Sequence, residues 1–193
     1  NEYQDLNLGN QYTLIVVFEY FNNGGNVQQL ASVESFTSSQ RALQFRVDAA
    51  SSSNTVRTIV FNTSGSATTL IGDSAIIDNY PNIAIARADG TTISIWQNGK
   101  QTASTTISGT VRSLDVGDFV VGNIGRGYGD PFTGIIHSFA GYNRPLTDAE
   151  LKNFSSVSAF YSIFFRASSP RVLPETAANT IPTLSLPGVT DIG

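Results

Sequence analysis

The stretch PNIAIARADGTTISIWQNGKQTAST, residues 81–105, decides the fold class of this chain. Two turn pairs, Asp89-Gly90 and Asn98-Gly99, separate runs in which apolar residues recur at every second position. Both pairs tolerate the positive φ angles of two-residue type I′ turns. The stretch therefore predicts a three-stranded antiparallel meander.

The same alternation assigns the faces of the meander. In its first strand, Ile83 and Ile85 share one face, and the alanines between them share the other. In the middle strand, Ile93 and Ile95 lie on one side and Trp96 on the other. A middle strand has neighbours on both edges, so we expect Trp96 to be packed.

Further strands are expected on both sides of the meander. The run 12–20 is β-branched and aromatic, and it is typical of a strand buried on both faces. Residues 42–48 and 56–62 alternate as half-buried strands do, and 115–125 holds a short apolar strand. Residues 132–143 predict two strand pieces, bent or bulged around Gly141.

One helix start is specified near the end of this pattern. Thr147 can cap the first turn, and Glu150 can reach back to the Thr147 amide, which together form a capping box. Such a cap contributes about 1 kcal/mol. We expect a short helix that ends near Val157 and rests Leu151 and Phe154 on the sheet.

Composition limits the classes of function. The chain has 193 residues and a formal net charge of −4, and its basic residues are scattered singly. We therefore expect one domain and no nucleic-acid partner. Cysteine is absent, which excludes disulfides and thiolate metal sites, and no segment reaches the length of a membrane span. Residues 167–193 are proline-rich and without periodicity, so we expect an extended tail or linker there.

Three motifs carry a family resemblance. WQNGK (96–100), the glycine-flanked block 125–135 and YNRPLTDAEL (142–151) follow one another in an order that is similar to concanavalin A-like jelly rolls of the laminin G type. The resemblance implies an all-β, two-sheet antiparallel jelly-roll sandwich with one short C-terminal helix, spanning residues 1–166. The tail 167–193 resembles those that follow such domains in tailed-phage virion proteins.

The residues give little support to catalysis. The only histidine, His137, lies in an expected strand, where a structural role is favoured. A glycosidase needs two carboxyl groups about 5 to 9.5 Å apart. Asp115 and Asp118 are spaced to lie on opposite faces of an extended strand, and Glu19 stands alone in its strand.

A binding role is favoured by the glycine-rich loop that follows residue 124. Tyr128, flanked by Arg126 and Asp130, is an exposed aromatic with polar neighbours, which is the pattern of a glycan site. Asp130 and Asn123 could supply oxygen ligands to calcium, although one carboxylate is few for that ion. Turn residues with no ligand are the simpler interpretation of both patterns.

We therefore expect a non-catalytic module of a phage virion, with a structural, decoration or adhesion role, that binds host-surface glycans through Arg126, Tyr128 and Asp130. A bacterial extracellular carbohydrate-binding or adhesion domain is the alternative, and a glycan hydrolase is the least favoured. The expected location is the virion surface, or the extracellular space under the alternative. The expected partners are other virion proteins, further copies of this chain and a glycan, with no membrane partner. No cofactor is expected, apart from the calcium considered above.

Overall fold

The computed structural model describes residues 8–22, 27–34, 40–48, 54–116, 118–123, 131–156 and 158–159. Within these ranges lie ten strands, one 3-10 helix, η1 (Leu114–Val116), and one α-helix, α1 (Asp148–Lys152). The strands are β1 (Gln11–Tyr20), β2 (Gln28–Glu34), β3 (Arg41–Asp48), β4 (Thr55–Phe61), β5 (Ala67–Ala75), β6 (Pro81–Asp89), β7 (Thr92–Gln97), β8 (Lys100–Thr106), β9 (Asp118–Val121) and β10 (Gly134–Tyr142). No helix in the described residues is long and apolar enough to cross a membrane.

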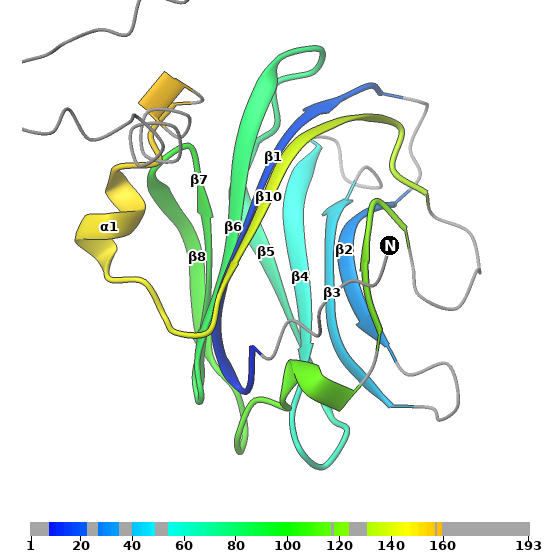
Figure 1. The fold of residues 1–193 in the computed structure, drawn as a ribbon, viewed down its shortest axis with the longest axis vertical. Coiled ribbons are helices and arrows are strands. Elements are labelled where there is room, and N and C mark those ends of the chain that lie inside the picture. Colours follow the sequence, from blue (N-terminus) through cyan, green and yellow to red (C-terminus); the bar gives the residue numbers. More distant parts are fainter. Residues whose placement is uncertain are drawn as a thin grey trace, which may run out of the picture.

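The strands form two antiparallel sheets that lie face to face (Figure 1). Sheet A has the order β10-β1-β6-β7-β8, and sheet B has the order β5-β4-β3-β2-β9. Strands that are distant in sequence are neighbours in both sheets, as in a jelly roll. The predicted two-sheet antiparallel sandwich is confirmed.

Strand β1 lies inside sheet A and is buried on both faces, as predicted. Its even-numbered residues from Tyr12 to Tyr20 enter the core between the two sheets. Ile15 and Val17 point the other way, into a second apolar cluster on the outer face of sheet A. Burial raises the pKa of Tyr12, so its phenol stays neutral in the core.

The predicted meander is formed by β6, β7 and β8, and its faces are as expected. Ile83, Ile85 and Trp96 lie in the outer cluster of sheet A, whereas Ile93 and Ile95 lie in the core between the sheets. Both residues of the Asn98-Gly99 turn have positive φ, which confirms a type I′ turn.

The prediction for the other meander turn is wrong in its type. Gly90 has φ +95°, but Asp89 has no positive φ. The register places Gly90 and Thr91 between the strands, so the glycine occupies the first central position of a type II′ arrangement. The Asp89 carboxylate instead accepts hydrogen bonds from the amides of Thr91 at 3.3 Å and Thr92 at 2.7 Å. This local bonding by aspartate determines the turn.

Strand β10 is one continuous strand, so the predicted bend around Gly141 is wrong. Gly141 pairs in register with Leu14 of β1. The register shift lies four residues earlier, where Val17 pairs with Ser138 and Phe18 with Ile136. His137 is therefore the extra residue of a β-bulge.

Helix α1 covers the outer face of sheet A, away from sheet B (Figure 1). The predicted capping box is present: the Thr147 side chain accepts from the Glu150 amide, and Glu150 accepts from the Thr147 amide. Leu151 and Phe154 are 0% and 3% exposed, and they pack on the outer cluster of sheet A as predicted. Burying two such side chains contributes about 1.5–3 kcal/mol each. The helix is shorter than predicted, because it ends at Lys152 with Asn153 as its C-cap.

Two strands, β2 and β5, were not predicted. Every residue of β2 is buried, including its polar ones, so the strand lacks the alternation by which strands are recognised.

Residues 160–193, which include the predicted tail, lie outside the described residues, so the predicted boundary at residue 166 remains a prediction.

Candidate functional site

The predicted ligand residues Arg126, Tyr128 and Asp130 lie outside the residues that the structure describes. Their glycan role, and the calcium role of Asp130, remain predictions. Asn123, the second calcium candidate, is described, and its carbonyl oxygen accepts a hydrogen bond from Ser32 Oγ at 3.2 Å. In the described part of the chain, no three His, Asp or Glu side chains form a group that could hold a metal ion.

The two aspartates considered for catalysis do not share a strand. Asp115 lies in η1, and Asp118 begins β9, so the prediction that they occupy opposite faces of one extended strand is wrong. The 3-10 helix η1 precedes β9, so Asp115 is not part of the strand. Asp115 Oδ2 accepts a hydrogen bond from Ser113 Oγ at 2.6 Å. Glu19 is the one carboxylate of β1, as predicted, and its Oε2 lies 3.4 Å from His137 Nε2 at the β-bulge of β10.

The outer face of sheet B carries a set of polar side chains on three neighbouring strands. Cross-strand pairing places Gln29 beside Arg46, and Arg46 beside Arg57, in one row across the sheet. Ser32 pairs with Gln44 in the next row. We define the polar face as Gln29, Ser32, Glu34, Gln44, Arg46, Asp48, Thr55 and Arg57.

The alternation of β3 explains why these residues point away from the core. Leu43, Phe45 and Val47 enter the core, as the sequence predicts, so Gln44 and Arg46 must point outward. In β2, the register shift between Gln29 and Ala31 leaves Leu30 as an extra residue on the core side. The bulge keeps Gln29 in step with Arg46 on the outer side.

Ion pairs fix the carboxylates of the polar face. Arg57 Nη1 donates a hydrogen bond to Asp48 Oδ2 at 2.8 Å. Near the other end of β3, Glu34 Oε1 accepts from Gln44 Nε2 at 2.7 Å and lies 3.5 Å from Arg41 Nε. The Glu34 side chain is 0% exposed. A buried carboxylate held in this way has a defined position, which is a requirement for selective recognition.

Several buried atoms of the polar face have no hydrogen-bond partner. They are both side-chain amide atoms of Gln29, Oε2 of Glu34, Nε of Arg57 and Oγ1 of Thr55. An unsatisfied buried polar group costs about 1–3 kcal/mol. Folded proteins hold few of these groups, and a solvent molecule or a ligand usually completes them. The polar face therefore holds buried donors and acceptors whose hydrogen-bonding capacity is unused.

Sequence analysis missed this face. Its residues come from three strands, and each of them looks like an ordinary solvent-facing position within its own strand. One sequence feature could have indicated the face. Gln28 and Gln29 come directly before a run of small and apolar residues, and adjacent amides are unusual at the start of such a strand.

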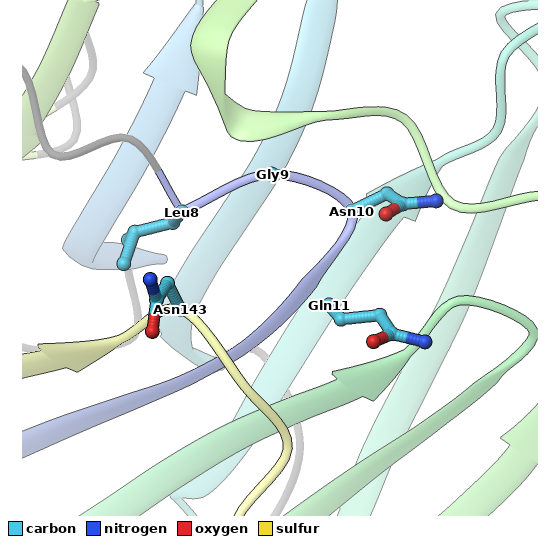
Figure 2. Close-up of a pocket in the computed structure, with 5 residues that line it drawn as sticks. All are labelled: Leu8, Gly9, Asn10, Gln11 and Asn143. Atoms are coloured by element: carbon cyan, nitrogen blue, oxygen red, sulfur yellow. The ribbon is translucent and has the colours of Figure 1, made fainter.

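A pocket lies where β1 begins and β10 ends, and it is the second candidate site. It has a volume of about 230 Å³ and is lined by Leu8, Gly9, Asn10, Gln11 and Asn143. Figure 2 shows Asn10 and Gln11 extending their amides in the same direction, whereas Asn143 lies beside Leu8. Gln11 Nε2 already donates to the Asp89 carbonyl at 3.2 Å. These amides do not converge on one point, so the hollow is a weaker candidate than the polar face.

Comparison with models of known families gives a match for this chain. The family model of the concanavalin A-like lectin/glucanases superfamily matches residues 1–152. The chain belongs to this superfamily. The family expectation drawn from the motifs at 96–100, 125–135 and 142–151 is thereby confirmed. A search of curated proteins finds no match.

Solved structures of the superfamily fold include carbohydrate-bound domains. The CBM40 of Ruminococcus gnavus IT-sialidase superposes with a TM-score of 0.65 at 21% identity, covering 78% of this chain and 84% of that chain. Its complex with α2,3-sialyllactose gives a TM-score of 0.63 at 20% identity, covering 76% and 83%. Domain 4 of the arabinanase AbnA from Geobacillus stearothermophilus, in complex with arabinotriose, gives a TM-score of 0.57 at 14% identity, covering 77% and 68%. At these identities the likeness shows the shared fold.

Proposed function

We propose that this domain is a non-catalytic binding module that holds a saccharide on the polar face of sheet B. The observation that carries the proposal is the set of buried, unpartnered polar atoms at Gln29, Glu34, Thr55 and Arg57. Sugar hydroxyls both donate and accept hydrogen bonds, so they can satisfy the Gln29 amide, the Glu34 oxygen and the Arg57 Nε at one surface.

The positions of the acids on this face support binding without hydrolysis. Glu34 pairs with Arg41, the first residue of β3, and Asp48 is the last residue of that strand. At ~3.3 Å per residue, the two ends of β3 are about 23 Å apart. Glycosidases place their two carboxyl groups within about 9.5 Å. Both carboxylates are also held by arginines, so they act in orientation rather than in proton transfer.

The superfamily supports this proposal. Two of the structures with this fold were solved with a carbohydrate, the IT-sialidase CBM40 with α2,3-sialyllactose and AbnA domain 4 with arabinotriose. Because both ligands differ in sugar type, the comparison supports a saccharide but does not select one. The arginines and carboxylates of the polar face favour a sugar that carries polar or charged substituents.

A glycan array tests the proposal. We expect wild-type protein to bind a defined subset of glycans and Arg57→Ala to lose that signal. Arg57 is chosen for this variant because its Nε has no hydrogen-bond partner and its Nη1 orients Asp48. The matched control is Arg144→Ala, which breaks an ion pair with Glu150 near α1, far from sheet B in the fold.

Two outcomes would contradict the proposal. One is an array signal for Arg57→Ala equal to that of wild type. The other is an equal loss of signal in Arg57→Ala and Arg144→Ala, because that would indicate a general loss of folding. Melting temperatures of all three proteins distinguish a lost site from a lost fold.

The glycine-rich loop is a second proposed contact for the same glycan. Tyr128 offers an aromatic plate, and Arg126 and Asp130 offer polar groups, as the sequence predicts. We expect Tyr128→Ala and Asp130→Ala to weaken the array signal with no change in melting temperature. If both variants bind as wild type does, the polar face alone carries recognition.

The biological setting is a separate proposal. The resemblance of residues 167–193 to the tails of tailed-phage virion proteins supports a place on a virion surface, where further copies of this chain and other virion proteins would be its partners. Deleting the residues after Ala167 should release the domain from assembled particles. Continued incorporation of the shortened protein would show that the tail does not attach the domain, and absence of the full-length protein from particles would favour an extracellular carbohydrate-binding or adhesion role.

A further inference from the structure

The loop between β5 and β6 displays two large apolar side chains. Ile77 is 56% exposed and Tyr80 is 60% exposed, the highest values among the large hydrophobic residues of the described chain. Exposed apolar side chains that lie together and border a pocket are candidates for a contact site. The way in which the loop is held supports that interpretation.

A buried asparagine fixes this loop. Asn82 is 0% exposed. Its Nδ2 donates to the carbonyls of Ile77 at 2.9 Å and Tyr80 at 2.7 Å, and its Oδ1 accepts from the Ile77 amide at 3.2 Å. Asn79 adopts a positive φ of 56°, and its amide donates to the Tyr20 carbonyl at 2.9 Å. These bonds hold the backbone of the loop, and the Tyr80 side chain is exposed to solvent.

Tyr80 lines a pocket of about 400 Å³. The other lining residues come from three parts of the chain, and all are uncharged: Ile77, Pro81, Asn98, Ser155, Ser156 and Ser158. We call this the Tyr80 pocket. It lies where the chain crosses from β5 of sheet B to β6 of sheet A, so it is separate from the polar face on β2, β3 and β4.

The serine wall of the pocket is held against the β7–β8 turn. A Cβ atom placed on Gly99 would lie 2.7 Å from Ser155 Cα, so the two backbones are in direct contact. Ser156 Oγ and Ser158 Oγ lie 3.0 Å apart and share a hydrogen bond. The pocket thus combines one exposed aromatic ring, one aliphatic side chain and a row of hydroxyls.

We propose that the Tyr80 pocket binds a neutral saccharide unit, with the sugar ring stacked on Tyr80 and its hydroxyls bonded to the serine wall. The face of a sugar ring presents C–H groups that pack on an aromatic ring, and its edge presents hydroxyls. The pocket volume is within the range of small-molecule sites. Its lining has no charge, so an ionic ligand gains nothing there.

A protein partner fits this surface less well. A stable protein interface covers about 800 Å² on each partner and has an apolar centre. The Tyr80 pocket has two exposed apolar side chains beside three serines, which suits a ligand that is itself covered with hydroxyls. The inference does not depend on the polar face, because it uses none of the same residues.

Protein NMR tests the proposal with a panel of neutral trisaccharides built from glucose, galactose, mannose or arabinose. With one member of the panel, we expect shifts in the amide signals of Ile77, Asn98 and Ser155. We also expect saturation transfer from the protein to the ring C–H protons of that sugar. Tyr80→Ala should weaken binding about tenfold, and Tyr80→Phe should keep it within about twofold, because stacking needs the ring.

Two controls separate this site from other effects. Ile71 is 51% exposed on β5 outside the pocket, and Ile71→Ala should leave binding unchanged. Arg57→Ala, which tests the polar face, should leave the shifts at Ile77 and Ser155 in place. Absence of those shifts with every member of the panel would overturn the proposal, and so would equal affinity of Tyr80→Ala and wild type.

Discussion

Thr13 and Leu146 are joined by a buried hydrogen bond, in which the Leu146 amide donates to Thr13 Oγ1 at 2.9 Å. The same hydroxyl donates to the Arg144 carbonyl at 3.0 Å. One side chain in β1 therefore holds the chain that leads from β10 to α1. Arg87 Nη1 also donates to the Leu146 carbonyl, at 3.0 Å, from the neighbouring strand. These bonds position the start of α1 on sheet A, where its apolar residues pack.

The Thr13→Val variant tests this connection. Valine keeps the shape of threonine but cannot bond to Leu146 or Arg144, which leaves two backbone groups without their partner. We expect the free energy of unfolding to fall by about 1–3 kcal/mol in urea denaturation. Thr13→Ser, which keeps the hydroxyl, should lose much less. A loss of stability in Thr13→Ser without a loss in Thr13→Val would show that the methyl group, not the hydroxyl, matters.

Local chemistry explains which parts of the fold could be predicted. The Asn98-Gly99 turn and the Thr147 cap are set by a few adjacent residues, and both were predicted correctly. The pairing of β1 with β6 and β10, and of β2 with β9, joins distant segments. No short stretch encodes such pairings, so they were not predicted. The family resemblance implied two antiparallel sheets but not which strands are neighbours.

The polar face was beyond prediction for a related reason. Burial of Gln29, Gln44 and Glu34 depends on which strands are neighbours, and strand β2 itself was not recognised. The loop residues Arg126, Tyr128 and Asp130 could be proposed because an aromatic in a glycine-rich loop is visible in sequence alone, and their role remains a prediction. Tyr80 offered a similar signal, an aromatic between Asn79 and Pro81, which was not used.

Gln29→Leu should separate stability from binding. Leucine is close to glutamine in volume and has no polar atoms, so the variant removes two unsatisfied buried groups. We expect the free energy of unfolding to rise by about 1–3 kcal/mol, while glycan-array binding falls. Urea denaturation and the array measure the two effects on the same preparation. A destabilised Gln29→Leu protein would mean that solvent or protein satisfies this amide in solution.

Two glycine variants distinguish strain from steric clash. Gly90 and Gly99 both have positive φ, so alanine at either position is strained by about 1–2 kcal/mol. A Cβ at Gly90 would meet nothing closer than 3.6 Å, whereas at Gly99 it would lie 2.7 Å from Ser155 Cα. We expect Gly99→Ala to lower the melting temperature clearly more than Gly90→Ala. Equal melting temperatures would show that residues after α1 yield to the added methyl group.

Asn82→Ala tests the support of the Tyr80 loop. The variant removes three hydrogen bonds, and the Ile77 amide loses its acceptor. We expect faster hydrogen exchange at the Ile77 amide and a stability loss of about 2 kcal/mol. The control is Asn143→Ala. Asn143 is an exposed residue that follows the end of β10, away from the Tyr80 loop, so this variant should change neither quantity. Unchanged exchange at Ile77 in Asn82→Ala would show that the loop is held by other contacts.

Glu150 makes the stability of helix α1 depend on pH in the acid range. Its hydrogen bonds from Arg144, and then from the Thr147 amide, lower the pKa of Glu150 to about 2 from an ordinary value of 4.5. A lowered folded-state pKa stabilises the fold above the unfolded-state pKa, and that stabilisation is lost as the pH falls from about 4.5 towards 2. The melting temperature of wild type should therefore fall more steeply over this window than that of Glu150→Gln. Arg144→Gln should reduce the steepness as well, because it removes the larger cause. Parallel curves for wild type and Glu150→Gln would show that the Arg144–Glu150 pair adds no stability in solution.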